Sequence, residues 1–185
     1  MKPKVLWMAG GAVLALLLTC GWTLRVLVLE ETRTGRWIFA RAVSPGDAFI
    51  LRYTHSVKRK PVWDFYIIDD HYEIMQYKTI FPDSDFGLPS HAARGETYTL
   101  LADGNGCISG MRRMIPALRL RVERAYDNIF SFNDSTILNL SHDPGDSVVD
   151  LHVHHIGLLH YTFQATRIYG ECLWKKKKNF WTTNS

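Results

Sequence analysis

The first apolar segment of the chain is one continuous run and not an alternating pattern. Residues Val5 to Leu24 contain no charged side chain, and Lys2, Lys4 and Arg25 flank them. A helix of about 20 apolar residues spans the hydrocarbon core of a bilayer. Lysines before such a helix favour the cytoplasm, so we expect the rest of the chain to lie outside it. Residues 1–24 are therefore predicted to be an N-terminal membrane anchor or signal segment.

Three interpretations of this apolar segment are consistent with its residues. An uncleaved signal anchor is one, because the run is longer than the roughly 7–15 apolar residues of a secretory signal peptide. Cleavage as a signal peptide is the second. The third is a lipoprotein in which Cys20 carries the lipid, after Leu18 and Thr19.

After Leu24 the hydrophobic pattern changes to short alternating runs separated by Gly, Pro, Asp and Asn. Such runs predict β-strands and turns. The predicted strands are residues 24–30, 36–43, 48–54, 62–68, 72–81, 96–102, 117–124, 135–141 and 147–156. Two hairpins are expected, one around Asp69-Asp70-His71 and one around the Asp143-Pro144-Gly145-Asp146 turn. We also expect Trp37, Phe39 and Val43 to lie near one face.

These elements predict an all-β fold, an antiparallel β-sandwich or barrel behind one N-terminal transmembrane or signal helix. The expected domains are the anchor, a β-domain over residues 25–169, and a tail over residues 170–185. The 185 residues suit one such domain with an appendage. The tail is rich in Lys and aromatic residues, which fits either a membrane interface or a frayed, solvated end.

The charge distribution argues against nucleic acid as a partner. The net charge is +4, from 22 basic and 18 acidic residues. Lys2, Lys4 and Lys175 to Lys178 supply six of the basic residues, which leaves 16 against 18 in the rest of the chain. The three cysteines are too few for a disulfide scaffold or a Cys-based zinc fold, and pairing of Cys107 with Cys172 stays open.

One polar cluster follows the predicted strand over residues 48–54. On a strand, Tyr53 and His55 should share one face. Asp64 would reach His55 if the segment between them folds back as a hairpin. The loop over residues 82–95 could close over a carboxylate. The predicted ligand-binding residues are Arg52, Tyr53, His55, Ser56, Asp64 and Tyr66, with His91 and Arg94 from this loop. The alternative is that these side chains satisfy backbone groups and pack in the core.

A second cluster lies on the predicted strand over residues 147–156. Asp150, His152 and His154 alternate along it and should project from one face. His-x-His spacing on a strand can bring two imidazoles to one metal ion, although a third ligand must come from elsewhere. The alternative is an exposed polar strand face, and we predict no cofactor.

The order of several motifs resembles an uncharacterised bacterial and archaeal family, the DUF family numbered eighteen-fifty. The motifs are Tyr53-Thr54-His55-Ser56-Val57, Pro61-Val62, Asp64, Tyr66, Phe81 and Phe86-Gly87-Leu88-Pro89. The family usually has Glu where this chain has Asp64, and a Ser-x-Gly-Ala-Gly-Leu-Pro-like loop where this chain has residues 83–89. The resemblance implies a small, membrane-anchored or exported β-domain, often encoded beside TRAP transporters of the TAXI type.

Together these features predict a non-enzymatic accessory or ligand-binding protein for TRAP-type solute transport. Its expected location is a bacterial or archaeal cell membrane, with the domain facing the periplasm or exterior. The expected partners are the lipid bilayer through residues 5–24, TRAP transporter subunits and a small anionic solute. Two alternatives stay open: a metal-dependent or hydrolytic enzyme using His55 with Asp64 or His152 with His154, and a purely structural membrane protein.

Overall fold

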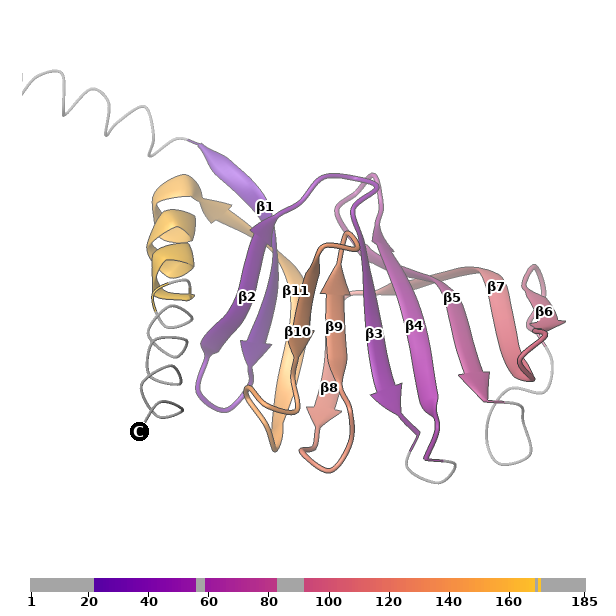
Figure 1. Ribbon diagram of the computed structural model, residues 1–185. Coiled ribbons are helices and arrows are strands. Elements are labelled where there is room, and N and C mark those ends of the chain that lie inside the picture. Colours follow the sequence, from indigo (N-terminus) through magenta and orange to yellow (C-terminus); the bar gives the residue numbers. More distant parts are fainter. Residues whose placement is uncertain (1–21, 56–58, 83–91, 169, 171–185) are drawn as a thin grey trace, which may run out of the picture.

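Strands dominate the part of the chain that the computed structural model describes, which comprises residues 22–55, 59–82, 92–168 and 170 (Figure 1). A short helix over residues 158–168 follows the last strand. The strands are β1 (Thr23–Glu31), β2 (Arg36–Ala42), β3 (Ala48–Thr54), β4 (Pro61–Ile68), β5 (Ile74–Pro82), β6 (Thr97–Leu100), β7 (Asn105–Ile115), β8 (Leu118–Val122), β9 (Ile129–Phe132), β10 (Thr136–Asn139) and β11 (Ser147–Gly157).

The strands form two antiparallel sheets. The smaller sheet has four strands in the order β2-β1-β11-β8, and the larger has seven in the order β10-β9-β3-β4-β5-β7-β6. Figure 1 shows that β5, β7 and β6 continue the larger sheet away from the smaller one. Of the predicted sandwich or barrel, the mostly β, antiparallel character is confirmed, and the two sheets make the fold similar to a β-sandwich.

An aromatic core fills the space between the two sheets. Phe39 from the smaller sheet meets Phe130 of β9 edge-on, with ring centroids 4.9 Å apart. Phe49 of β3 stacks on Tyr66 of β4 at 4.8 Å. Such rings bury large areas and interlock in a few geometries, so they fix how the sheets pack.

Strand β1 is buried on both of its faces. Leu27 and Leu29 point into the core between the sheets, whereas Val26 and Val28 belong to a separate apolar cluster on the other side. All four side chains are at most 1% exposed. Residues Tyr161 and Ile168 of the helix pack against this second cluster, so the helix covers the outer face of the smaller sheet. This explains why residues 26–29 are a continuous apolar run instead of an alternating one.

The predicted hairpin of residues 135–141 and 147–156 is wrong. Strand β10 pairs with β9 in the larger sheet, whereas β11 pairs with β1 and β8 in the smaller one. The Asp143-Pro144-Gly145-Asp146 segment does reverse the chain, but it carries the chain from one sheet to the other. Turn residues indicate a change of direction and do not specify which strands will pair.

The predicted common face for Trp37, Phe39 and Val43 is also wrong for one residue. Leu29 pairs with Phe39 but Glu30 pairs with Trp37, so β2 contains one extra residue, Ile38, at a β-bulge. An extra residue moves the following side chains to the opposite face. Trp37 therefore packs on the outer face beneath the helix, while Phe39 and Val43 lie in the core.

Three elements were not predicted: β7, β9 and the helix. Residues 105–106 look like part of a turn, but they begin β7, which pairs with β5 and β6. Thr23 and Leu24, which we placed at the end of the apolar helix, are the first residues of β1. Within the described residues, no helix has the length and apolar character needed to cross a membrane. Most of the apolar run, together with Cys20 and Cys172, lies outside the described residues, and Cys107 is a buried free thiol.

We expect Phe130→Ala to lower the free energy of unfolding by about 3–5 kcal/mol, because the ring is fully buried between the sheets and its removal leaves a cavity. Chemical denaturation followed by far-UV circular dichroism measures this loss. Ile137→Ala is the matched control, since this side chain is 69% exposed, and it should change the value by less than about 0.5 kcal/mol. Equal losses in both variants would contradict the assigned core.

Candidate functional site

The Tyr-Thr-His block lies at an open end of the space between the two sheets. Tyr53, Thr54 and His55 at the end of β3 line a cleft of about 230 Å³. The opposite wall comes from β8 and the connection that follows it. Its residues are Leu120, Arg121, Glu123, Tyr126 and Asn128. The cleft thus lies between the two sheets. The His55 imidazole lines one wall and the Arg121 guanidinium lines the other, and both are hydrogen-bonding groups.

A buried asparagine shapes the wall that faces the Tyr-Thr-His block. The Asn128 side-chain amide donates to the backbone carbonyls of Glu123 at 3.2 Å and Tyr126 at 3.0 Å. Its backbone N–H donates to the Ser141 hydroxyl at 2.9 Å, and that hydroxyl donates to the carbonyl of Tyr126. Buried polar groups that satisfy each other in this way hold a loop in one conformation. Asn128 is therefore a positioning residue for the cleft.

The charge in the cleft comes mainly from one exposed ion pair. The Arg121 guanidinium lies 3.1 Å from the Glu123 carboxylate. An exposed pair of this kind contributes at most about 1 kcal/mol, so a ligand carboxylate can replace Glu123 at little cost. Arg52, one of the predicted ligand-binding residues, lies elsewhere. It does not line this cleft, and it pairs with Asp127 at 3.3 Å.

Asp64 is the centre of a different, mostly buried network. Its carboxylate accepts hydrogen bonds from the Thr79 hydroxyl at 2.6 Å and the Gln76 amide at 3.1 Å, and also from the Tyr53 hydroxyl. Burial raises the pKa of the Asp64 carboxyl, and these hydrogen bonds oppose that rise. Burial and the neighbouring Asp64 carboxylate also raise the pKa of the Tyr53 hydroxyl.

The strand register explains why Asp64 has these partners. Strands β3 and β4 do pair as a hairpin, the condition for Asp64 to reach His55, but the register places Asp64 opposite Leu51, four positions before His55. Tyr53 is the residue of the block that reaches the carboxylate. Asp64 thus belongs to a structural network, His55 lines the cleft, and Tyr53 takes part in both.

The other predicted binding residues do not join the cleft. Tyr66 is only 3% exposed and stacks on Phe49, so its role is in the core. Arg94 lies in an exposed turn before β6. Ser56 and His91 lie outside the described residues. The sequence missed Arg121, Tyr126 and Asn128, because they come from the other side of the fold.

A family model described as a domain of unknown function, DUF1850, matches residues 49–138. Over this segment the chain is similar to the DUF1850 family. The resemblance predicted from the Tyr-Thr-His-Ser-Val block is thereby confirmed. No curated protein and no solved structure matches the chain.

The DUF1850 segment contains all of the described residues that line the cleft, from Tyr53 to Asn128. It does not contain β1, β2 or β11. However, β8 of the segment pairs with β11, and the core includes Leu27 and Leu29 of β1. The walls of the cleft are therefore held in place by strands on either side of the DUF1850 segment.

The second predicted cluster lies outside the DUF1850 segment, on the outer face of the smaller sheet. His152 and His154 do share a face, and their Nε2 atoms are 2.5 Å apart. Asp150 is bound elsewhere: Arg119 donates to its two oxygens at 2.7 and 2.9 Å. The carboxylate that lies beside the two histidines is that of Glu30 on β1 and not that of Asp150. One ligand atom from each of Glu30, His152 and His154 lies within 4.8 Å of the others.

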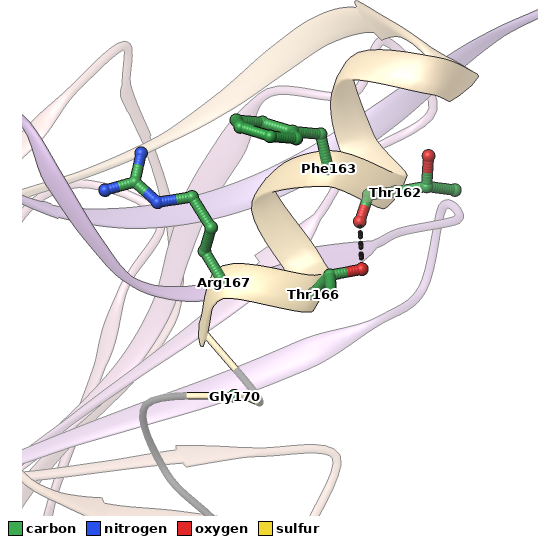
Figure 2. A pocket seen from close by; sticks show the side chains of 5 residues that line it. All are labelled: Thr162, Phe163, Thr166, Arg167 and Gly170. Atoms are coloured by element: carbon green, nitrogen blue, oxygen red, sulfur yellow. Dashed lines mark hydrogen bonds between the residues drawn. The ribbon is translucent and has the colours of Figure 1, made fainter. Parts of the chain in front are cut away.

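A hollow on the helix is shallow and differs from the cleft in chemistry. Thr162, Phe163, Thr166, Arg167 and Gly170 line about 550 Å³ (Figure 2). Phe163 and Arg167 project to the same side, and the Thr166 hydroxyl donates to the carbonyl of Thr162 at 2.8 Å. The exposed Phe163 ring and the Arg167 guanidinium both line this hollow, which has no second wall facing them as the cleft does.

We expect Asp64→Asn to alter how stability depends on pH. The pKa of the carboxyl is raised by burial in the folded chain and returns to its ordinary value of 3.8 on unfolding. As the pH rises through this interval, the unfolded state loses its proton first, so the free energy of unfolding of the wild type falls. Asn does not titrate, and the variant should gain stability relative to the wild type from about pH 4 upward.

Denaturant unfolding between about pH 4 and pH 8 measures this difference. Asp70→Asn is the control, because Asp70 is exposed in the turn between β4 and β5. A difference between Asp64→Asn and wild type that stays constant over this range would contradict the prediction.

Proposed function

We propose that the protein is a membrane-anchored, extracytoplasmic binding module that assists solute uptake by a TRAP-type transporter. On this proposal it has the β-sandwich fold behind one N-terminal membrane helix, and its cleft binds a small anionic solute. The observation that carries the binding role is the cleft itself, where the Tyr-Thr-His block of the DUF1850 segment faces Arg121 across the two sheets.

An anionic solute fits the groups that line the cleft. Arg121 and His55 can both donate hydrogen bonds to a carboxylate, and a guanidinium does so with two parallel bonds. The Arg121–Glu123 pair is exposed, so replacing the Glu123 carboxylate by that of a ligand costs little free energy. The Tyr126 ring and the Leu120 side chain form an apolar part of the cleft wall, which is common in small-molecule sites.

Binding is favoured over hydrolysis by the position of Asp64. A catalytic histidine of the triad type needs a carboxylate that fixes its tautomer and orientation. Asp64 was the predicted carboxylate, but Tyr53, Thr79 and Gln76 engage it in the buried network. The geometry of the DUF1850 segment therefore supports a binding role for His55 better than an acid–base role with Asp64.

A location at a membrane surface is supported by the apolar groups where the described fold begins. The backbone N–H of Leu158, at the start of the helix, donates to the carbonyl of Trp22 at 2.8 Å. Nearby along the chain, Trp22, Leu159 and Phe163 are 69%, 43% and 63% exposed. Aromatic and apolar side chains of this kind suit the head-group region beside an anchor. The TRAP partnership rests on the family resemblance.

The anionic-solute proposal predicts that the full-length chain binds succinate and discriminates against succinamide, its uncharged analogue. Isothermal titration calorimetry in detergent measures both. Arg121→Gln and His55→Ala should each weaken succinate binding about tenfold or more, since each removes a hydrogen bond to a charged group. Arg112→Gln, an exposed arginine on β7, should bind as wild type does. Equal binding of the two ligands, or no binding of succinate, would overturn the anionic-solute assignment.

The transporter proposal predicts that crosslinking in membranes captures TRAP subunits with the full-length chain. After mild detergent extraction, mass spectrometry of the purified chain should recover these subunits well above the level seen with an unrelated protein that carries one membrane anchor. Recovery at the control level would show that the partnership is wrong while leaving the binding cleft to be judged by calorimetry.

A further inference from the structure

The outer face of the smaller sheet carries a group of side chains that the proposed function does not use. In the register of β1 and β11, Glu30 lies opposite Asp150, and Val28 lies opposite His152. Glu30 and His152 are thus diagonal neighbours on one face, and His154 follows His152 on the same face. Two central strands of a sheet hold all three side chains, so their backbone positions are fixed.

The distances between the donor atoms suit one shared ion. One ligand atom from each of Glu30, His152 and His154 lies within 4.8 Å of the others. Ligands at about 2.0–2.2 Å from a tetrahedral zinc ion are roughly 3.3 Å apart, so small side-chain rotations bring these atoms into place. The Nε2 atoms of the two histidines are 2.5 Å apart, closer than an ordinary hydrogen bond between nitrogens, so binding of one ion requires them to separate slightly.

The negative charge of Glu30 also favours binding of a cation by these three side chains. Within the part of the chain that the structure describes, Glu30 forms no ion pair with a lysine or arginine. The neighbouring Asp150 does have such a partner in Arg119, at 2.7 Å. A partly buried carboxylate beside two imidazoles is a donor set with one negative charge, and this set suits a divalent transition metal.

The surroundings would hold the ligands in place. The Trp37 indole stacks on the His154 ring, with centroids 5.9 Å apart and planes inclined by 14°. Trp37 also meets the ring of His160, on the helix, edge-on at 5.7 Å. The apolar cluster of Val26, Val28 and Ala40 lies on the same face under the helix. Such packing fixes ring orientation and limits access of water, as the outer shell of a metal site does.

We propose that Glu30, His152 and His154 form a binding site for a divalent transition metal of the zinc class, outside the DUF1850 segment. Three protein ligands leave a fourth position for water or an exchangeable ligand. The ion would join β1 to β11 beneath the helix. Imidazole and carboxylate ligands should bind zinc, cobalt or nickel ions and not magnesium, which prefers an all-oxygen octahedral set.

The test uses the untagged full-length chain in detergent, freed of metal with a chelator and titrated with zinc chloride in a calorimeter. We expect one zinc ion per chain and a zinc-dependent rise in the unfolding temperature. Magnesium chloride should give neither effect. Absence of saturable zinc binding would overturn the site.

Variants decide whether these three side chains hold the ion. Glu30→Gln, His152→Ala and His154→Ala should each weaken zinc binding about 100-fold or more, since loss of a ligand costs more than loss of an outer-shell partner. The matched controls are Asp150→Asn and His155→Ala. His155 is exposed and bonds to the Thr23 hydroxyl, and both controls should bind zinc within a few-fold of wild type.

Far-UV circular dichroism establishes that each variant is folded. If the histidine variants fail to fold, Glu30→Gln alone decides, because it keeps the size and shape of the side chain. Wild-type zinc affinity in Glu30→Gln, or an equal loss in His155→Ala, would overturn the assignment. None of these outcomes depends on the solute cleft, because no residue that lines the cleft is one of the three proposed metal ligands.

Discussion

Burial of β1 on both faces is the constraint on which the rest of the structure depends. A strand with four consecutive apolar side chains cannot leave either face in water without losing the hydrophobic contribution of two of them, about 1.5–3 kcal/mol for each large side chain. The larger sheet covers one face, through Phe130 and Phe132, and the helix over residues 158–168 covers the other. The positions of the sheet and the helix both follow from this requirement.

The same constraint explains why the DUF1850 segment is an incomplete folding unit. Its strand β8 belongs to the smaller sheet, where its only neighbour in the described fold is β11. Without β1 and β11, the inner faces of β3, β9 and β8 would expose their apolar side chains. The cleft needs β3 and β8 to face each other, so its geometry depends on residues beyond those that carry the family resemblance. A family model can thus include the residues that line a cleft and omit the strands that align them.

Much of the strand pattern was predictable, because alternation is a local property. The strand predicted over residues 117–124 forms as β8 and alternates as such a strand should, since Leu118, Leu120 and Val122 face the core and Arg119 does not. What failed was pairing across the chain. The partners of β10 and β11 depend on which sheet each strand joins, and Trp37 changed face because of a single-residue bulge. The helix was missed because it begins directly after Gly157, the last residue of β11, and packs as a short cover on one apolar cluster.

The candidate sites show the same division between local and distant information. The sequence placed His152 and His154 on one face but could not indicate Glu30, which is more than 120 residues away along the chain and joins them only through the β1–β11 register. Likewise, the Tyr-Thr-His block was visible, but Arg121 on the opposite wall was not. The position of Asp64 also differs from the expectation, because the hairpin register places it opposite Leu51 and its carboxylate bonds to Tyr53.

The central place of β1 also determines how the domain would respond to mechanical load. The described fold begins at this strand, which is hydrogen-bonded along its length to β2 on one side and β11 on the other. A pull applied at Trp22 acts along the strand axis, whereas the ladder hydrogen bonds lie across it. A pull that the rest of the smaller sheet resists is therefore shared between the two ladders that hold β1 on both sides.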